Sequence, residues 1–231
     1  MEHLIRQFEN FSLWRFSNAS LKEASNFIIE TNYKSHLGYY PTTIKREIEE
    51  LYKREKCWLQ DSFFYGIRNN QGNIIGTIRT LRWTKKYVLP IQAVFDINID
   101  NIQEKETKMP NIWHIGCLAI DSFSLGKASS VILKILLVQA LFHICSNESI
   151  MFAECDRKLY EKIRLLGIYM LQAGESKNHI GSETIPVYNI SRNLKPFLWK
   201  QQRYLYIAET ESIFQMRNKK EYETTEFLLE E

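Results

Sequence analysis

The chain has 231 residues, of which 45% are hydrophobic and 13% aromatic, and this is enough to bury one sizeable core. Its net charge of +3 is too small to indicate a protein that binds nucleic acid. The four cysteines stand singly at positions 57, 117, 145 and 155, so we expect no zinc ribbon and no thioredoxin-type site, but a reduced, cytoplasmic protein.

The first half of the chain is predicted to begin with two helices. Ser20 and Glu23 have the spacing of a capping box, which predicts that a helix over residues 20–34 begins there. A second helix is expected over residues 42–55, because a threonine at its start can cap it and its apolar residues fall on one face.

A β-hairpin is expected over residues 62–83. Two runs rich in β-branched and aromatic residues flank the sequence Asn-Asn-Gln-Gly at positions 69–72, whose composition is typical of a turn. Residues 84–110 have a proline near each end, and we predict a long irregular connection there.

The second half alternates buried strands with helices. A nearly continuous apolar run predicts a central strand, and the next segment is apolar over most of its circumference, as in a deeply packed helix. The longest apolar stretch within that helix is too short to span a bilayer, so we expect no transmembrane segment. The expected elements are strand 112–121, helix 127–145, strand 149–155, helix 156–167 and strand 184–191.

This order of elements predicts an α/β fold with a central mixed sheet and helices on both faces. The β-α-β order predicts that strands 112–120 and 149–155 are parallel neighbours. We expect one domain over residues 1–208, followed by an acidic tail over residues 209–231. The tail has a net charge of −4, which leaves +7 on the rest of the chain. The segment after Pro196 is expected to be helical in its last part.

The turn after the central strand has the composition of an anion-binding site. A helix N-terminus presents unpaired N–H groups, and a glycine lets an anion approach the backbone. An ordinary strand-to-helix turn is the alternative. The residues that would hold a pyrophosphate are Ser124, Gly126, Lys127 and Ala128.

Two residues are candidates for proton transfer. Histidine titrates near neutrality and is the usual general base, so His114 in the central strand is one candidate. Tyr160, near the start of a helix, is the other, because its hydroxyl could protonate a leaving thiolate. The alternatives are a hydrogen-bonded core histidine and a tyrosine that packs through its ring.

An arginine among apolar residues of the hairpin needs an anionic partner. Arg79 shares a strand face with Thr77 and Leu81, so its partner is either a substrate carboxylate or a structural acid such as Asp61. A Cys-His hydrolase built from His114 with Cys117 or Cys155 is disfavoured, because both thiols lie in apolar runs where they stay protonated.

Taken together, these segments resemble the GNAT superfamily of N-acyltransferases, in which a central strand splays from its neighbour to receive acyl-pantetheine. The sequences GYYP, DSFFYGIRNNQGNIIGTIRTLRW and IWHIGCLAI resemble the acyl-homoserine-lactone synthases and, more closely, the long-chain N-acyl amino acid synthases. LLGIYMLQAGESKNHIGSETIPVYNI is similar to the later part of the second group. The resemblance covers roughly residues 20–192 and implies a three-layer α-β-α fold with a splayed mixed sheet.

The chain departs from these families at three positions. Phe123 stands where the phosphate-binding turn has Gln or Arg, His114 stands where they have Glu, and Cys117 stands where they have Arg. Histidine can still accept a proton, so the hypothesis keeps His114 as the base. The missing arginine argues against a homoserine-lactone product.

The resemblance implies an N-acyltransferase that moves a long-chain fatty acyl group from acyl carrier protein or coenzyme A, as co-substrate, to the amine of an amino acid or similar small molecule. No permanently bound cofactor and no metal are expected. His114 would deprotonate the amine, Tyr160 would protonate the thiol, and Arg79 and Arg82 would hold an acceptor carboxylate. The backbone N–H groups that would polarise the thioester belong to Cys117, Leu118 and Ala119.

A basic stretch over residues 192–203 bears on the donor. It is either a solvated helix face or a docking patch for an acidic partner. Acyl carrier protein is acidic in general, and this patch together with Phe123 favours it over coenzyme A. The basic residues are Arg192, Lys195, Lys200 and Arg203.

Two other functions remain open. One is a small-molecule acetyltransferase that uses acetyl-coenzyme A, which would need no long apolar tunnel. The other is a catalytically silent acyl-binding regulatory module, which the changes at His114 and Cys117 would suit.

Overall fold

A single mixed sheet forms the centre of the structure, a computed structural model that describes residues 2–106, 109–179 and 181–206. Within these residues nine strands pair in the order β1-β2-β3-β4-β5-β6-β9-β7, with β8 also paired to β9. Every pair is antiparallel except β5–β6. The strands are β1 (His3–Gln7), β2 (Phe11–Arg15), β3 (Ser62–Asn69), β4 (Ile74–Arg82), β5 (Asn111–Ile120), β6 (Ser149–Asp156), β7 (Leu171–Gln172), β8 (Lys177–His179) and β9 (Ser182–Ile190).

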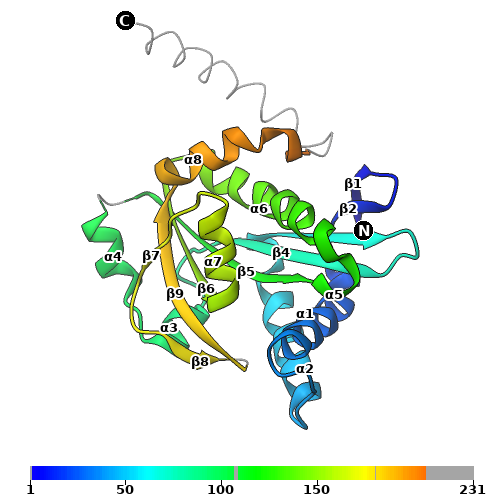
Figure 1. Cartoon of the computed structure of the whole chain (residues 1–231). Helices are drawn as coiled ribbons and strands as arrows, with labels where there is room; N and C mark the ends of the chain where they lie inside the picture. The colour runs from blue at the N-terminus through cyan, green and yellow to red at the C-terminus, as the bar shows by residue number, and fades with distance from the viewer. Residues whose placement is uncertain (1, 107–108, 180, 207–231) are drawn as a thin grey trace, which may run out of the picture.

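Helices cover both faces of the sheet, which confirms the predicted three-layer α/β architecture (Figure 1). Helices α1 to α4 pack on one face, and α6, α7 and α8 pack on the other. The helices are α1 (Leu21–His36), α2 (Ile44–Trp58), α3 (Pro90–Phe95), α4 (Ile99–Lys105), α5 (Ser122–Leu125), α6 (Ser129–Cys145), α7 (Arg157–Leu165) and α8 (Ser191–Lys200). Short 3-10 turns lie at Asn18–Ser20 (η1), Leu59–Asp61 (η2), Gly126–Ala128 (η3) and Gln202–Tyr204 (η4).

Helix α6 is the core helix that the sequence predicts. Its apolar residues surround the axis, so the stable arrangement buries it between the sheet and α8. The stretch Ser122–Cys145 is long and apolar enough to cross a membrane by composition, but 61% of its most apolar window is buried inside the protein. This burial is what a core helix shows, and a core helix can pass the same test of length and composition.

Strands β5 and β6 run parallel and then part, as the sequence and the family resemblance predict. They pair only from Asn111 with Ser149 to Ile115 with Ala153. Beyond that point β5 pairs with β4 alone, and β6 pairs with β9 alone. The two strands therefore leave a gap in the middle of the sheet.

A β-bulge lies on β5 where the gap begins. Thr77 of β4 faces Ala119 and Arg79 faces Gly116, so Cys117 and Leu118 together oppose one residue of β4. Cys117 has φ +56°, a left-handed conformation that a bulge residue adopts, and its carbonyl accepts a hydrogen bond from the Thr77 hydroxyl at 2.7 Å. The bulge redirects the strand at the point where it leaves β6.

The connection over residues 84–110 is more regular than predicted. It contains α3, which begins with Pro90, and α4, which is capped by the Asn98 side chain. Buried residues of both helices, Ile91 and Ile99, pack beside Trp58 of α2. The prediction of an irregular connection was therefore wrong, because helices of 6 and 7 residues give no clear periodic signal.

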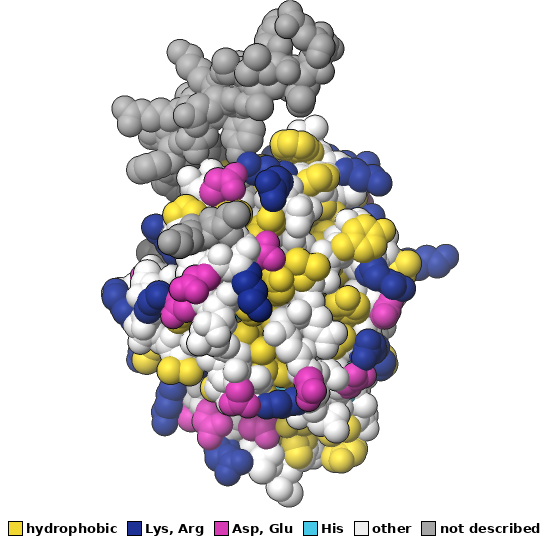
Figure 2. All heavy atoms as spheres, turned by 90° about the vertical axis from the view of Figure 1, so that its left-hand side faces the viewer, with side chains coloured by type: hydrophobic (Ala, Val, Ile, Leu, Met, Phe, Trp, Pro, Cys, Tyr) yellow, Lys and Arg dark blue, Asp and Glu magenta, His cyan; other side chains and the backbone are white. Residues whose placement is uncertain are grey.

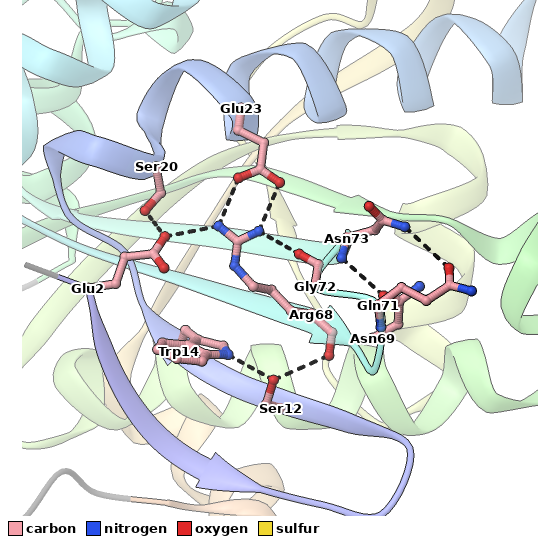
Figure 3. Close-up of polar contacts among 10 residues, drawn as sticks. All are labelled: Glu2, Ser12, Trp14, Ser20, Glu23, Arg68, Asn69, Gln71, Gly72 and Asn73. Atoms are coloured by element: carbon pink, nitrogen blue, oxygen red, sulfur yellow. Dashed lines mark hydrogen bonds and ion pairs between the residues drawn. The ribbon is translucent and has the colours of Figure 1, made fainter.

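The capping box predicted for α1 does not form. Ser20 is the N-cap residue, but its hydroxyl donates to Glu2 and accepts no hydrogen bond from the helix N–H groups. Glu23 instead accepts two hydrogen bonds of 2.8 Å from the Arg68 guanidinium. Figure 3 shows Arg68 also bonded to Glu2 at 2.9 Å and to the Gly72 carbonyl, so one side chain ties the N-terminal segment, α1 and the β3–β4 turn together.

The acidic tail over residues 209–231 lies outside the described residues, and so does the helix expected in its last part. The domain boundary at residue 208 stays a prediction.

We expect Arg68→Ala to destabilise the protein by about 1.5–3 kcal/mol, the range for hydrogen bonds to charged groups, because it removes the guanidinium that Glu2 and Glu23 share. Urea unfolding measures this. Arg46→Ala is the matched control, because that exposed residue has only an exposed pair with Glu50, and the control should change stability by less than about 0.5 kcal/mol. Equal effects of the two variants would contradict the anchoring role of Arg68.

Candidate active site

A cavity of about 420 Å³ lies at the gap between β5 and β6. Alternate residues of a strand point to opposite faces of the sheet, so the cavity has a different wall on each face. His114 and Glu154 point toward α2, while Ile115, Met151 and Ala153 point toward α6. The cavity therefore passes through the sheet, from a polar arm on one face to an apolar arm on the other.

The apolar arm lies between β6, α6 and α7. The residues that line this stretch are uncharged, and one of them is Ala153, the last residue of β6 paired to β5, where the gap begins. Such a wall suits an alkyl chain. The lining residues are Leu137, Leu141, Met151, Ala153, Leu159, Ile163, Ile168 and Met170.

The polar arm lies between the sheet and helices α1 and α2. It combines carboxylates, arginines and histidines from several elements, among them β8, which brings His179 to the wall. The charged or titratable lining residues are Tyr33, His36, Glu47, Glu50, Arg54, Arg79, His114, Glu154, Asp156 and His179.

A chain of buried polar contacts crosses four elements at the bottom of the polar arm. Glu55 of α2 accepts from Arg79 Nε of β4 at 3.1 Å, and Arg79 Nη1 lies 2.8 Å from Nδ1 of His114 on β5. His114 Nε2 lies 3.0 and 3.1 Å from the two carboxylate oxygens of Glu154 on β6. The side chains of Glu55, Arg79 and His114 are each 1% exposed, whereas that of Glu154 is 12% exposed.

Gly116 makes room for this chain. A Cβ atom at position 116 would lie 2.7 Å from Arg79 Nη2, which is too close for two non-bonded atoms. The guanidinium can therefore sit flat against the β5 backbone, where Nη1 also donates to the His114 carbonyl at 3.0 Å.

The contacts fix the protonation of His114. A guanidinium has only donors, so Nδ1 of His114 must be the acceptor, and the ring hydrogen is on Nε2, where it is donated to Glu154. Burial lowers the pKa of His114, and the positive charge of Arg79 lowers it further, although Glu154 acts in the opposite direction. The ring is neutral in this arrangement.

Glu154 is held as a carboxylate. Burial acts to raise its pKa, but the His114 N–H and the charges of Arg79 and Arg54 hold the pKa below its usual range. Glu55 is ionised for the same kind of reason: burial opposes its charge, and Arg79 and Arg54 overcome that effect.

The two cysteines near the cavity are unsuited to nucleophilic attack. Burial raises the pKa of the Cys117 thiol, and the Glu55 carboxylate raises it further. Burial also raises the pKa of Cys155, with Glu154 and Asp156 adding to the effect. Both thiols stay protonated at neutral pH, which is consistent with the sequence-based argument against a Cys-His hydrolase.

Only some of the residues singled out in the sequence meet at the cavity. Arg79, His114, Cys117 and Leu118 line it. The structural partner of Arg79 is Glu55 rather than Asp61, which accepts from the Tyr87 hydroxyl. The other predicted site residues lie elsewhere: Arg82 is exposed and bonded to Asn111, Ala119 is buried against Thr77, and the Tyr160 hydroxyl lies 3.5 Å from the Met170 carbonyl.

The predicted phosphate-binding turn is partly occupied by its own side chains. The Asp121 carboxylate accepts from both the backbone N–H and the hydroxyl of Ser124, and the Ser129 hydroxyl donates to the Gly126 carbonyl at 2.7 Å. Gly126, Lys127 and Ala128 form the 3-10 turn η3 and lie outside the cavity lining. An anion at this turn would have to displace Asp121 from Ser124.

The basic stretch forms α8 and η4 on the face of α6. Arg192, Lys200 and Arg203 are exposed, and Lys195 is half-buried. Figure 2 shows the side of the molecule that lies on the left in Figure 1. Basic and acidic side chains are interspersed with apolar ones there.

The charged residues that the sequence analysis missed include Glu55, Arg54 and Glu154. Glu154 had a usable signal, since it is an acid inside a buried strand next to the strand that carries His114. Glu55 and Arg54 had none, because their helix is rich in charge and only the packing of α2 decides which side chains face the sheet.

We expect Glu55→Ala to destabilise the protein by about 3–5 kcal/mol, the usual cost of removing one partner of a buried pair, because Arg79 would remain buried with an unpaired charge. Urea unfolding by circular dichroism measures the loss. Glu49→Ala on the same helix is the matched control, since its pair with Lys22 is exposed and the change should leave the urea midpoint nearly unchanged. A Glu55 effect as small as that of the control would contradict the buried ion pair.

No protein-family model matches the sequence, and no curated protein matches it significantly. Solved structures do match the fold. FdhC, described as a nucleotide-linked sugar GNAT, has a TM-score of 0.51 at 14% identity and covers 88% of this chain and 99% of its own.

Two further structures match over similar lengths. FeeM, an N-acyl amino acid synthase from uncultured soil microbes, has a TM-score of 0.51 at 14% identity and covers 80% of this chain and 92% of its own. TofI, solved in a ternary complex with an inhibitor and MTA, has a TM-score of 0.55 at 14% identity and covers 79% of this chain and 91% of its own. With its splayed strands and three layers, the chain has the GNAT fold that its sequence resemblance predicts.

Proposed function

We propose that this chain is an N-acyltransferase that moves a long acyl group from a thioester to the amine of a small molecule. The observation that carries the proposal is the cavity through the sheet. It joins an apolar arm, suited to an alkyl chain, to a polar arm suited to an amine, at the gap where β5 and β6 part. The fold shared with FeeM, an N-acyl amino acid synthase, supports the same class of reaction.

The thioester carbonyl would lie at the bulge of β5. Among the described strands, Cys117 and Leu118 have no register partner on β4 or β6, and in this proposal their N–H groups face a ligand in the gap. Such donors stabilise the oxyanion that forms when a nucleophile adds to the carbonyl. The acyl chain would then extend into the apolar arm, and the amine would approach from the polar arm.

Arg54 is the better candidate to hold an acceptor carboxylate. The Arg79 guanidinium already bonds Glu55 and His114, so little of it is left for a substrate. Arg54 lines the same arm, is 42% exposed, and has its Nε 3.5 Å from Glu55. In this proposal Arg79 organises the site, and Arg54 contacts the acceptor.

The contacts of the turn after β5 support acyl carrier protein as the donor. Ser124 is occupied by Asp121, and Phe123 stands, 64% exposed, where a family member would place Gln or Arg for the phosphates of coenzyme A. The exposed basic residues of α8 would meet an acidic carrier. Acetyl transfer from acetyl-coenzyme A is the second candidate, but an acetyl group would leave the apolar arm unfilled.

Expression of the chain in a bacterial host should produce N-acyl compounds that are absent when the vector is empty. Mass spectrometry of the lipid extract detects them, and purified protein with acyl carrier protein or coenzyme A thioesters of matched chains identifies the donor. The Leu118→Pro variant, which lacks one of the proposed oxyanion N–H groups, should make at least about 100-fold less product. If no donor gives an N-acyl product, the proposed activity is overturned; acetyl products alone would establish the acetyltransferase.

Filling the apolar arm should shorten the preferred acyl chain. Leu141→Phe adds a ring to the wall, and each methylene that no longer fits forfeits about 0.8 kcal/mol, or about a fourfold loss in kcat/KM. Chains shorter by two or more methylenes should therefore be favoured over the wild-type optimum. Val131→Phe, on the exposed side of the same helix, is the matched control and should leave the chain-length profile unchanged. An unchanged profile for Leu141→Phe would place the acyl chain outside this arm.

A further inference from the structure

The chemistry of the acceptor side points to a residue that the sequence did not single out. We propose that Glu154 is the catalytic group that accepts the amine proton, and that His114 is a positioning residue that orients Glu154. This inference rests on the proposed function. It replaces the sequence-based hypothesis that His114 itself takes the proton, and the two are distinguished by their contacts.

His114 has no lone pair available for a substrate. Its Nδ1 lone pair accepts from Arg79 at 2.8 Å, and its Nε2 carries the hydrogen that points at Glu154. A proton could reach Nδ1 only if the bond to Arg79 broke, and the cation would then face a guanidinium inside a buried site. His114 is also 1% exposed, so a substrate amine would have to displace Glu154 to reach the ring.

Glu154 has what His114 lacks. Each carboxylate oxygen accepts a share of the single His114 N–H, at 3.0 and 3.1 Å, and each keeps further acceptor capacity. The side chain lines the cavity on its polar face and is 12% exposed. It comes from β6, directly beyond Ala153, so it stands at the point where the strands part and the thioester carbonyl would lie.

The His114 contact explains why the carboxylate stays in place. A lone carboxylate on a buried strand has several rotamers. The charged or titratable groups that face it, besides His114, are Arg79 on β4, Arg54 on α2 and His179 on β8. The His114 N–H, held in turn by Arg79 and Glu55, selects the rotamer that presents the carboxylate to the cavity. The buried chain thus ends on Glu154, its most exposed member.

The proton balance of the reaction is simple. The neutral amine nitrogen adds to the thioester carbonyl, which forms the C–N bond and leaves a positive nitrogen and an oxyanion. Glu154 takes one proton from that nitrogen, the oxyanion electron pair restores the C=O bond, and the C–S bond breaks. Glu154 then returns the proton to the departing thiolate, so the products are an amide and a thiol. A weakly basic carboxylate suffices, because a nitrogen in the tetrahedral adduct is far more acidic than a free ammonium ion.

Glutamine substitutions separate the two residues. Glu154→Gln keeps the shape of the side chain but cannot accept a proton, so kcat should fall at least about 100-fold while KM for the acyl donor stays within about threefold. His114→Gln retains an acceptor for Arg79 and an N–H donor for Glu154, yet it cannot act as a base. It should keep kcat within about tenfold of wild type.

Further variants complete the design. His114→Ala, which removes the donor to Glu154, should lose more activity than His114→Gln, and Glu154→Asp should recover part of the activity lost in Glu154→Gln. Glu161→Gln on α7 is the matched control, because that side chain is exposed and pairs with Arg164. Circular dichroism melting of each variant separates loss of fold from loss of chemistry.

A weakly basic acceptor provides the deciding measurement. Once a hydroxylamine has added to the thioester, its nitrogen is acidic enough to lose a proton to water, so it needs no protein base. With hydroxylamine, Glu154→Gln should recover to within about tenfold of wild type.

The proposal is overturned if hydroxylamine fails to rescue Glu154→Gln, or if His114→Gln loses 100-fold and is rescued while Glu154→Gln stays active. These outcomes differ from failure of the proposed function, in which the wild-type protein forms no amide with any acceptor.

Discussion

The buried ion pair between Glu55 and Arg79 is the interaction on which the site depends. A guanidinium that is 1% exposed must be matched by an anion and by acceptors for its remaining donors, or its burial would cost more than the fold can supply. Glu55 meets the first need, and His114, through Nδ1 and its carbonyl, meets the second. The pair therefore joins α2 to the sheet and at the same time sets the polarity of the His114 ring.

The second constraint is the parting of β5 and β6. Because alternate strand residues face opposite sides, a gap in the sheet joins two environments that the sheet would otherwise keep apart. Before the β5 bulge, even-numbered positions carry His114 toward α2, as they carry Glu154 on β6, and odd-numbered positions carry Met151 and Ala153 toward α6. A molecule in the gap would have its polar end among charges and its apolar end among aliphatic side chains. Fold and chemistry are linked at this point through strand register alone.

The strongly periodic parts of the fold could be predicted from the sequence. Helix α6 and the β3–β4 hairpin carry clear apolar patterns, and the helical crossover between β5 and β6 favours a parallel pair. The β1–β2 hairpin and the helices α3 and α4 were missed, since each is short and β1 is mostly exposed. The charged residues of the site could likewise be predicted only where the local sequence pattern marks them. Arg79 and His114 stand out in apolar strands, whereas Glu55 and Arg54 lie in a helix with many charged residues, where only tertiary packing tells a buried charge from a solvated one.

The structure shows which residues could replace the family's glutamate and arginine at the positions where this sequence departs from the family pattern. The sequence has histidine where the families have glutamate on the central strand, but a carboxylate is present 3.0 Å from that histidine on the neighbouring strand. It has Cys117 where they have arginine, and Arg54 of α2 lines the same arm. The cavity thus contains both an acid and a cation, supplied by different elements. A reaction that needs an acid and a cation requires both to lie beside the gap. It does not require either of them to come from a particular strand or helix.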